Sequence, residues 1–287
     1  MKKILYISSI LTLLFAFPLY AVESRELEDI IENIINSNAL VKETKSAPAK
    51  KENAGTDDRK ESKNNKSASF PSPDEALLKS GIQLFEASLY ENSRQKFEEL
   101  KTKYPDSSFR DISSIWLSKI YSQQNNYSDA VKTLASINQE SGEYPAALFY
   151  TGEINLKKGD ESGAIEYFYR VPALFPDHEL ADDSLIAIAK LYCKNNKGNQ
   201  SLEAAIKVIK NYGKRETIDD AYFVIAQVFE KDAMLKDIGI ARKIYKIFLK
   251  KAGVEKAPFF YNSPLLSKVK KNLKDIETTY YSKAFVD

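Results

Sequence analysis

Residues 144–176 constrain the fold most strongly, because they hold two amphipathic helical patterns separated by a short break. The first apolar run ends at the Lys-Lys-Gly-Asp sequence of residues 157–160, and the second ends at Pro176. Lysines before a glycine, and a proline after an apolar run, are typical of helix ends. The segment therefore predicts a helix–turn–helix of roughly 34 residues. We expect Ala164 in the second helix to face Gly152 in the first, where the two backbones approach closely.

The same alternation recurs from residue 74 onward, with helical runs of roughly 12–16 residues separated by short breaks. A small residue near the start of each second helix marks the repeat, and these residues are Ser93, Ala130, Ala164, Ala205 and Ala241. The intervals between them are 37, 34, 41 and 36 residues, and we interpret the polar residues 195–200 as an insertion in the longest one.

A last helix is expected after Ser263-Pro264, because serine caps helix N-termini and proline suits the first helical turn. The outer side of this helix is basic, as suits a terminal helix that covers the end of a repeat array. The sequence thus predicts an all-α fold of about five helix pairs plus a C-terminal capping helix, within a repeat domain that spans residues 74–287.

The first twenty-one residues resemble a secretory signal peptide. Lys2 and Lys3 precede an apolar run over residues 4–20, and the small Ala21 is a suitable cleavage site. We expect cleavage after about Ala21 and a periplasmic protein. An uncleaved anchor in the inner membrane is the alternative, since a run of about 17 apolar residues is at the lower limit for a membrane span. Val22 stands where a lipoprotein would need a cysteine.

Two further segments precede the repeats. Residues 22–41 predict a short amphipathic helix, in which the isoleucines recur at three- and four-residue spacing opposite acidic residues. This helix either folds back on the repeats or serves for docking or self-association. Residues 42–73 are rich in Lys, Glu, Asn and Ser, so they cannot bury enough apolar surface to fold and are predicted to be a disordered linker. A flexible coil of this length spans on the order of 30 Å.

Composition argues against several classes of function. Loss of Lys2 and Lys3 with the signal peptide brings the formal net charge from +2 to zero, so no general field attracts nucleic acid or anionic lipid, and we expect no nucleic-acid partner. Contact with a membrane is expected only through partners or through an uncleaved N-terminal segment. Cys193 is the single cysteine, which excludes an intramolecular disulfide.

Catalytic chemistry is not indicated by any motif. The lone His178 has no second histidine to help it hold a metal, and we interpret it as a residue of a surface loop. Cys193 has no histidine partner either, and we interpret it as a packing or semi-exposed residue. Phosphate-binding loops and metal-ligand spacings are not found. We therefore predict a protein that is not an enzyme and that uses no cofactor and no metal.

From about residue 74 to 280 the chain resembles a tetratricopeptide array, that is, an α-solenoid. The junctions Tyr104-Pro105-Asp106-Ser107 and Phe175-Pro176-Asp177, and the Ser263-Pro264 cap, are similar to those of bacterial envelope members. These members are the periplasmic protein associated with the Tol–Pal system and cell division, and the lipoprotein of the outer-membrane β-barrel assembly machine. The chain departs from the lipoprotein by lacking the lipidated cysteine, and from the division protein by having only a short helix at 24–41.

The resemblance implies a non-enzymatic scaffold for protein–protein interaction in the cell envelope, either in outer-membrane assembly or in the coordination of cell division. Its partners would be other envelope proteins or their peptide segments. Two alternatives stay open at this point. One is an accessory subunit that regulates an envelope enzyme, and the other is a membrane-anchored adaptor, if the N-terminal segment is not cleaved.

The candidate binding surface lies on the first helices of the pairs, which line the concave wall of such arrays. An apolar row runs there beside a row of lysines and amides, at four-residue spacing. Such a surface suits a peptide with apolar anchors and acidic side chains, although a plain solvated helix face fits the same pattern. The residues are Ile115, Lys119, Gln123, Phe149, Glu153, Lys157, Ile186, Lys190, Lys194, Phe223, Gln227 and Lys231.

Overall fold

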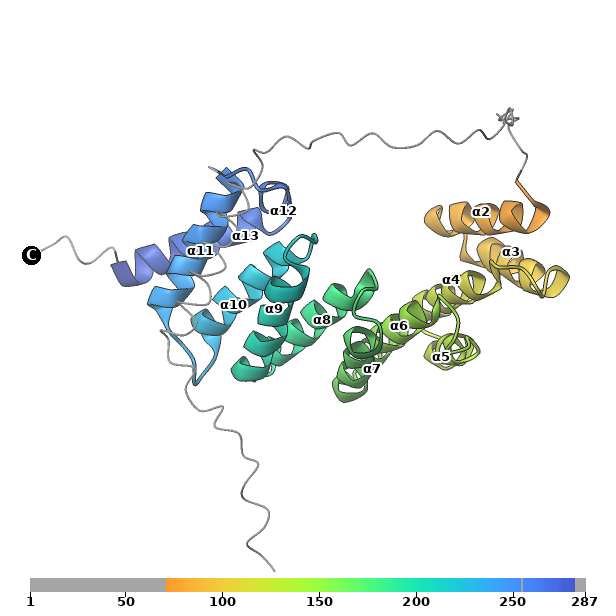
Figure 1. The fold of residues 1–287 in the computed structure, drawn as a ribbon, viewed down its shortest axis with the longest axis horizontal. Coiled ribbons are helices and arrows are strands. Elements are labelled where there is room, and N and C mark those ends of the chain that lie inside the picture. The colour runs from red at the N-terminus through yellow and green to blue at the C-terminus, as the bar shows by residue number, and fades with distance from the viewer. Residues whose placement is uncertain (1–70, 254, 282–287) are drawn as a thin grey trace, which may run out of the picture. The chain divides into compact units, whose positions relative to one another are not determined.

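The computed structural model describes residues 71–253 and 255–281. The predicted signal peptide, the predicted short helix and nearly all of the predicted linker lie outside these residues. The described part is helical (Figure 1). Its helices are α2 (Pro73–Glu86), α3 (Tyr90–Lys103), α4 (Arg110–Gln123), α5 (Tyr127–Ala135), α6 (Tyr144–Lys157), α7 (Glu161–Leu174), α8 (Leu180–Lys194), α9 (Gly198–Tyr212), α10 (Ile218–Lys231), α11 (Ile238–Gly253), α12 (Pro258–Tyr261) and α13 (Leu266–Ile276), followed by a π-helical turn at Glu277–Tyr281.

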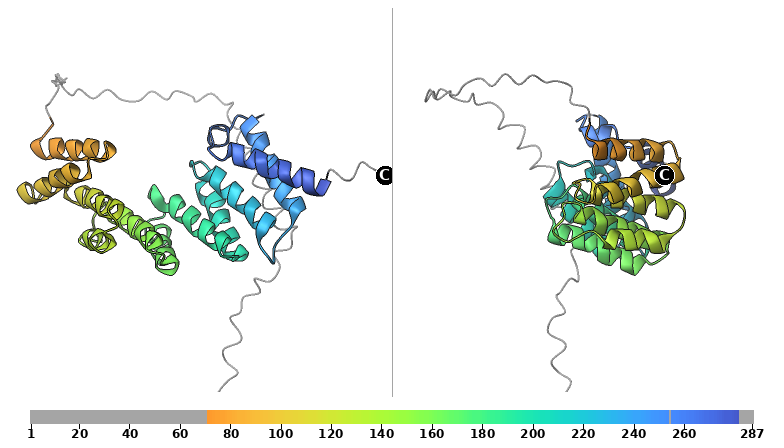
Figure 2. Two further views of the ribbon diagram at one scale, coloured as in Figure 1. Left: turned by 180° about the vertical axis from the view of Figure 1, so that it is seen from behind. Right: turned by 90° about the vertical axis from the view of Figure 1, so that its right-hand side faces the viewer.

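The helices pack as five consecutive pairs, from α2/α3 to α10/α11. Each first helix also contacts the first helix of the next pair, and each second helix contacts the first helix that follows it. The two further views in Figure 2 show α13 beside α11, which it contacts at the C-terminal end of the array. The predicted all-α fold of five helix pairs plus a capping helix is therefore confirmed.

Four of the five pairs share one turn. In each, a single residue adopts a positive φ after the first helix: Ser88, Asn125, Gly159 and Asn196, with φ of 60°, 59°, 83° and 52°. The amide of the next residue donates to the carbonyl oxygen five positions before it, as in the bond of 2.8 Å from Asn126 to Tyr121. This is the αL helix ending that satisfies orphan carbonyls and fixes how the second helix departs.

The position of the shared turn at Asn196 corrects the register that the sequence predicts for the fourth pair, α8/α9. Ser93 Oγ donates to the Gly81 carbonyl oxygen at 2.8 Å, and Ser201 Oγ donates to the Ala189 carbonyl oxygen at 2.8 Å, so Ser201 rather than Ala205 is the equivalent small residue. The interpretation of residues 195–200 as an insertion is thus wrong, since α9 already begins at Gly198. The extra residues lie between α10 and α11, whose connection lacks the positive-φ turn.

In two of the pairs, α2/α3 and α6/α7, a phenylalanine of the second helix packs against a glycine of the first. A Cβ added to Gly81 would lie 2.6 Å from the Phe97 ring, and one added to Gly152 would lie 2.8 Å from the Phe168 ring. Both phenylalanines are almost fully buried, as is Ala164. Gly152, which the sequence analysis predicts as a point of close approach, therefore receives the Phe168 ring of the second helix.

The capping helix is joined to the last pair by polar as well as apolar contacts. Val269, Leu273 and Ile276 of α13 are buried. Tyr245 Oη of α11 donates to Glu230 Oε2 of α10 at 2.6 Å, and Asn272 Nδ2 of α13 donates to Tyr245 Oη at 2.9 Å. Ser263 Oγ accepts from the Leu265 amide at 3.0 Å, within the turn before the helix, so α13 starts slightly later than its predicted cap.

Candidate functional site

The first helices α2, α4, α6, α8 and α10 form what we call the first-helix surface, on which all the predicted binding residues were placed. Three of these residues are buried in the core, since Ile115 and Ile186 are each 4% exposed and Phe223 is 3% exposed. Lys268 of α13 lies over the Phe223 ring, with Nζ 5.0 Å from the ring centroid. These three side chains pack the array in this structure, and a partner does not reach them. Phe149 and Gln227 are half-buried.

Four of the predicted residues come together in one cavity. Lys119 and Gln123 of α4 and Glu153 and Lys157 of α6 line a pocket of about 290 Å³. Phe85 from the end of α2, Tyr150, Ile154 and the hydroxyl-bearing Ser118 and Ser122 complete its wall. We call this the first-helix pocket. The four-residue spacing on two neighbouring helices is what brings these polar side chains to one place.

Aromatic rings and a hydroxyl position the two lysines of this pocket. Lys119 Nζ lies 4.4 Å from the centroid of the Trp116 ring and 4.2 Å from that of the Tyr150 ring, so the ammonium is held between two faces. Lys157 Nζ donates to Ser122 Oγ at 3.1 Å. Neither contact neutralises the positive charge.

Glu153 is the acidic residue among the side chains that line this pocket. Glu153 is exposed, but the surrounding protein displaces much of the water near its carboxyl group. This desolvation raises the pKa of Glu153, while the charges of Lys157 and Lys119 act to lower it. Two lysines and one poorly solvated carboxyl give the pocket a net positive character. The arrangement can bind a carboxylate of a ligand, with Phe85 and Tyr150 available for an apolar neighbour.

The other predicted lysines lie in a different electrostatic setting. Lys190 Nζ is 2.7 Å from Asp220 Oδ1, and Lys194 Nζ is 2.6 Å from Glu161 Oε1. Desolvation, together with the charges of Asp182, Glu216 and Asp220, raises the pKa of Asp183 to about 6. On the described first helices, Lys190 and Lys194 are therefore paired with carboxylates while Asp183 adds an acidic group, whereas Lys119 and Lys157 have no such ion pair.

Sequence reasoning missed this acidic stretch because it followed only the rows that contain the lysines. Asp183 and Asp220 lie three residues before Ile186 and Phe223, on the same side of their helices. A three-residue step from Ile186 and Phe223 toward the helix N-terminus finds them, because residues three apart lie on one side of a helix.

His178 and Cys193, the two residues considered for metal binding or catalysis, have contacts that fit a role in the fold. His178 Nδ1 accepts the Leu180 amide at 3.1 Å in the junction before α8. Cys193 is half-buried, and burial raises the pKa of its thiol. Within residues 71–253 and 255–281, no three His, Cys, Asp or Glu side chains gather around a possible metal position. None of the described helices has the length and apolar character needed to cross a membrane.

The family model described as "Tetratricopeptide repeat" matches residues 75–107 and 146–178, which cover α2/α3 and α6/α7 with their junctions. No curated protein matches the chain in sequence. A solved tetratricopeptide repeat protein from Parabacteroides merdae ATCC 43184 is similar at 12% identity and a TM-score of 0.53, over 71% of this chain and 73% of that one.

Two other solved structures have lower TM-scores. MamA protein has 17% identity and a TM-score of 0.47, over 64% of this chain and 95% of its own. The C-terminal part of a tetratricopeptide repeat-containing protein from Cytophaga hutchinsonii has 16% identity and a TM-score of 0.46, over 70% and 79% of the two chains. At such identities the likeness concerns the fold, and it rests on the structure with the TM-score above 0.5. With its five helix pairs, a turn shared by four of them and two segments that match the repeat model, the described part of the chain has the fold of a tetratricopeptide repeat solenoid.

Proposed function

We propose that this protein is a scaffold that binds an extended segment of a partner protein in the first-helix pocket. The single observation that supports this most is the pocket itself, where Lys119 and Lys157 converge beside Tyr150 and Phe85. A partner residue with a carboxylate would pair with the lysines, and an adjacent apolar side chain would contact the rings. Repeat arrays of this kind present such surfaces along their first helices.

The charges along the first helices favour one orientation of the proposed segment, because Lys190 is already paired with Asp220 and is not available to a partner carboxylate. An acidic residue is favoured at α4 and α6 and disfavoured beside Asp183 and Asp220 at α8 and α10, because like charges repel. The segment therefore places its acidic end at the first-helix pocket and neutral or basic residues toward α10. Such charge matching selects partners and speeds association more than it adds affinity.

We place this activity in the bacterial cell envelope, in outer-membrane assembly or in the coordination of cell division. Two features support this setting: the basic and apolar pattern of residues 1–21, and the resemblance of the Tyr104-Pro105 and Phe175-Pro176 junctions to those of envelope members. The intact mass of the protein purified from cells tests the export step. Loss of about the first 21 residues is expected. A chain that still begins at Met1 contradicts cleavage and favours an anchored adaptor.

Site-specific photo-crosslinking in living cells tests the binding face. A photoreactive amino acid replaces Gln123, which is exposed at the first-helix pocket, and a matched variant carries it at Lys210, which is exposed on the second helix α9. We expect a discrete crosslinked partner from position 123 that is missing from position 210. Crosslinks of equal intensity at both positions, or at 210 alone, contradict the proposal.

A further inference from the structure

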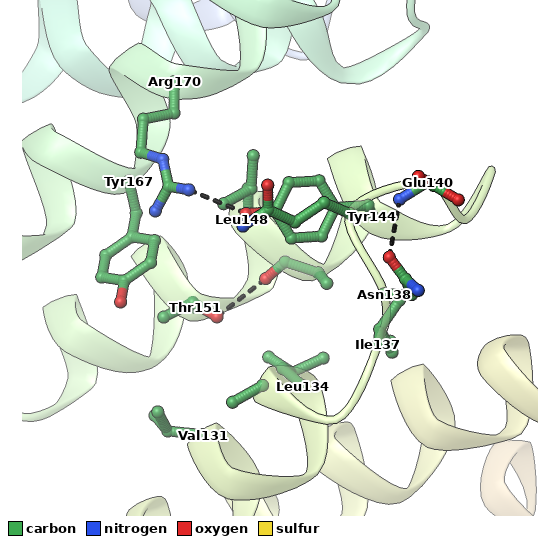
Figure 3. Close-up of a pocket in the computed structure, with 13 residues that line it drawn as sticks. Val131, Leu134, Ile137, Asn138, Glu140, Tyr144, Leu148, Thr151, Tyr167 and Arg170 are labelled. Carbon is green, nitrogen blue, oxygen red and sulfur yellow. Dashed lines mark hydrogen bonds between the residues drawn. The ribbon is translucent and has the colours of Figure 1, made fainter.

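A second cavity lies between the second helices of the middle pairs. α5 has 9 residues, whereas α3 and α7 on either side of it have 14. The chain leaves α5 at Ala135 and reaches α6 through residues 136–143, so α7 has no full-length neighbour there. The result is a pocket of about 650 Å³ that α5, α6, α7 and the connecting segment line (Figure 3). We call it the Arg170 pocket.

The lower wall of the Arg170 pocket is apolar, and its rim is open to solvent. Leu134 and Leu148 are buried, and Val131 and the Tyr167 ring extend the apolar surface. The Thr151 hydroxyl is already engaged, since it donates to the Ala147 carbonyl oxygen at 2.8 Å. The rim at Ala135 and at residues 138–140 is exposed to solvent. A ligand can therefore enter from the side of the connecting segment and place an apolar group against α5 and α6.

Arg170 supplies the positive charge of this pocket. Its Nη2 donates to Tyr144 Oη at 2.7 Å, and its guanidinium carbon lies 5.5 Å from the centroid of the Tyr167 ring. The Tyr144 ring packs edge-on against Phe175, with centroids 6.1 Å apart, which fixes the phenol that holds the arginine. Among the described residues no carboxylate forms an ion pair with Arg170. Its guanidinium thus keeps donors for a ligand, and it favours a carboxylate that can accept two parallel bonds.

A second charge lies at the opposite side of the pocket. Figure 3 shows Arg170 on α7 and Glu140 on the connecting segment, with Tyr144 between them. The Glu140 amide donates to Asn138 Oδ1 at 3.1 Å, which holds this part of the rim in place. A ligand is therefore favoured when its carboxylate faces Arg170 and its far end carries no negative charge.

From this geometry we propose that the Arg170 pocket is a second binding site, which takes a peptide segment of a partner protein with an acidic residue beside a bulky apolar one. The acidic side chain pairs with Arg170, and the apolar one contacts Leu134, Leu148 and Tyr167. The site shares no lining residue with the first-helix pocket, so it is independent of the function proposed above. The half-open rim suits a side chain presented by a peptide better than a small molecule, which pockets normally enclose.

Parallel peptide display on the full chain tests this assignment. Random 12-residue peptides are selected on four proteins: the wild type, Arg170→Gln, Ala135→Trp and Lys157→Ser. Arg170→Gln removes the charge, Ala135→Trp fills the pocket from its exposed rim, and Lys157→Ser alters only the first-helix pocket. We expect a family of peptides with an acidic residue beside an apolar one that is enriched on the wild type and on Lys157→Ser and lost on the other two.

Titration calorimetry then measures the most enriched peptide of that family on each protein, with circular dichroism to confirm folding. Arg170→Gln is expected to weaken binding about tenfold or more, as is usual for loss of a charged hydrogen-bond partner, and Arg170→Lys to restore part of the affinity. The proposal is overturned if no peptide is enriched on the wild type, if the family persists on Arg170→Gln, or if it depends on Lys157 and not on Arg170. The last outcome assigns peptide binding to the first-helix pocket alone.

Discussion

Gly152 is the residue whose replacement tests the packing of the third pair most simply. An alanine Cβ there would lie 2.8 Å from Cδ1 and Cε1 of Phe168, a ring that is only 1% exposed and has little space to move. Overpacking of this kind costs about 1–3 kcal/mol, and the better helix propensity of alanine returns about 1 kcal/mol. We expect Gly152→Ala to lower the free energy of unfolding, as measured by denaturant titration.

Gly253→Ala is the matched control, because Gly253 also lies in a helix and an added Cβ there meets no atom within 4 Å. It should leave stability unchanged or slightly raised. Shortening the ring in the double variant Gly152→Ala, Phe168→Leu should recover part of the loss. Equal stability of the two single alanine variants would mean that α6 and α7 do not cross at the distance described.

Asp183 makes stability depend on pH. Its pKa is raised from 3.8 to about 6, chiefly by desolvation, so the folded state holds the proton more tightly than the unfolded chain does. Stability therefore falls as the pH rises from about 4 to about 6, and the full penalty is present above that range. We expect Asp183→Asn to raise the free energy of unfolding by about 1–2 kcal/mol at pH 7.5 and to have little effect at pH 4. Denaturant titrations at the two pH values measure the difference.

The neighbouring Asp182 should behave in the opposite way. Its carboxylate accepts from Arg215 and from the Thr217 hydroxyl, each at 2.6 Å, and it is 2% exposed. Asp182→Asn leaves the Arg215 guanidinium without its carboxylate, and we expect it to destabilise the protein at pH 7.5. If both asparagine variants shift stability in the same direction at neutral pH, the electrostatic account of this end of α8 is wrong.

At the level of elements, the helix pairs were predictable because their signals are local. Gly159 and Pro176 end helices, and the small residues recur at intervals of the mid-thirties. The register of the fourth pair was not predictable in the same way. Ser201 and Ala205 are both small and four residues apart, so they lie on one face of α9 and the sequence offers no choice between them. The hydrogen bond of Ser201 to the Ala189 carbonyl decides it.

The candidate site was predicted only in part, for a related reason. The positions of Lys119 and Lys157 follow from spacing within single helices, whereas Phe223 packs against Tyr245 of α11 and Lys268 of α13, which are distant in sequence. One signal was present in α10 itself. Residues 221–226 are apolar without interruption, and a helix that is apolar on all sides is normally buried on all sides.

The link between α13 and the last pair gives a prediction for that element. Tyr245→Phe removes the hydroxyl that joins Glu230 of α10 to Asn272 of α13, and it leaves a buried network incomplete. A loss of about 1–3 kcal/mol is expected. Hydrogen exchange should show it as faster exchange of the α13 amides, with α2 and α3 unchanged. Uniform loss of protection along the array would contradict a local role for this network.

Across the whole repeat domain, the two pockets draw on different sets of helices. The first-helix pocket is lined by α2, α4 and α6, and the Arg170 pocket by α5, α6 and α7, so α6 contributes to both. Because neighbouring repeats stabilise one another, changes that loosen α6 should weaken both sites, whereas changes at Lys157 or Arg170 should affect one each. Since the two pockets share no lining residue, two acidic segments would not compete for the same side chains if both proposed sites bind.

The central claim is that an acidic partner segment binds at Lys119 and Lys157. The most direct measurement is the affinity of the partner crosslinked at position 123 for the wild type, Lys157→Ser and the matched control Lys210→Ser, at low and at high salt. We expect Lys157→Ser to weaken binding about threefold to tenfold at low salt and much less at high salt, because exposed charges are screened. Lys210→Ser should bind like the wild type. Equal affinities of all three proteins at both salt concentrations would contradict the account.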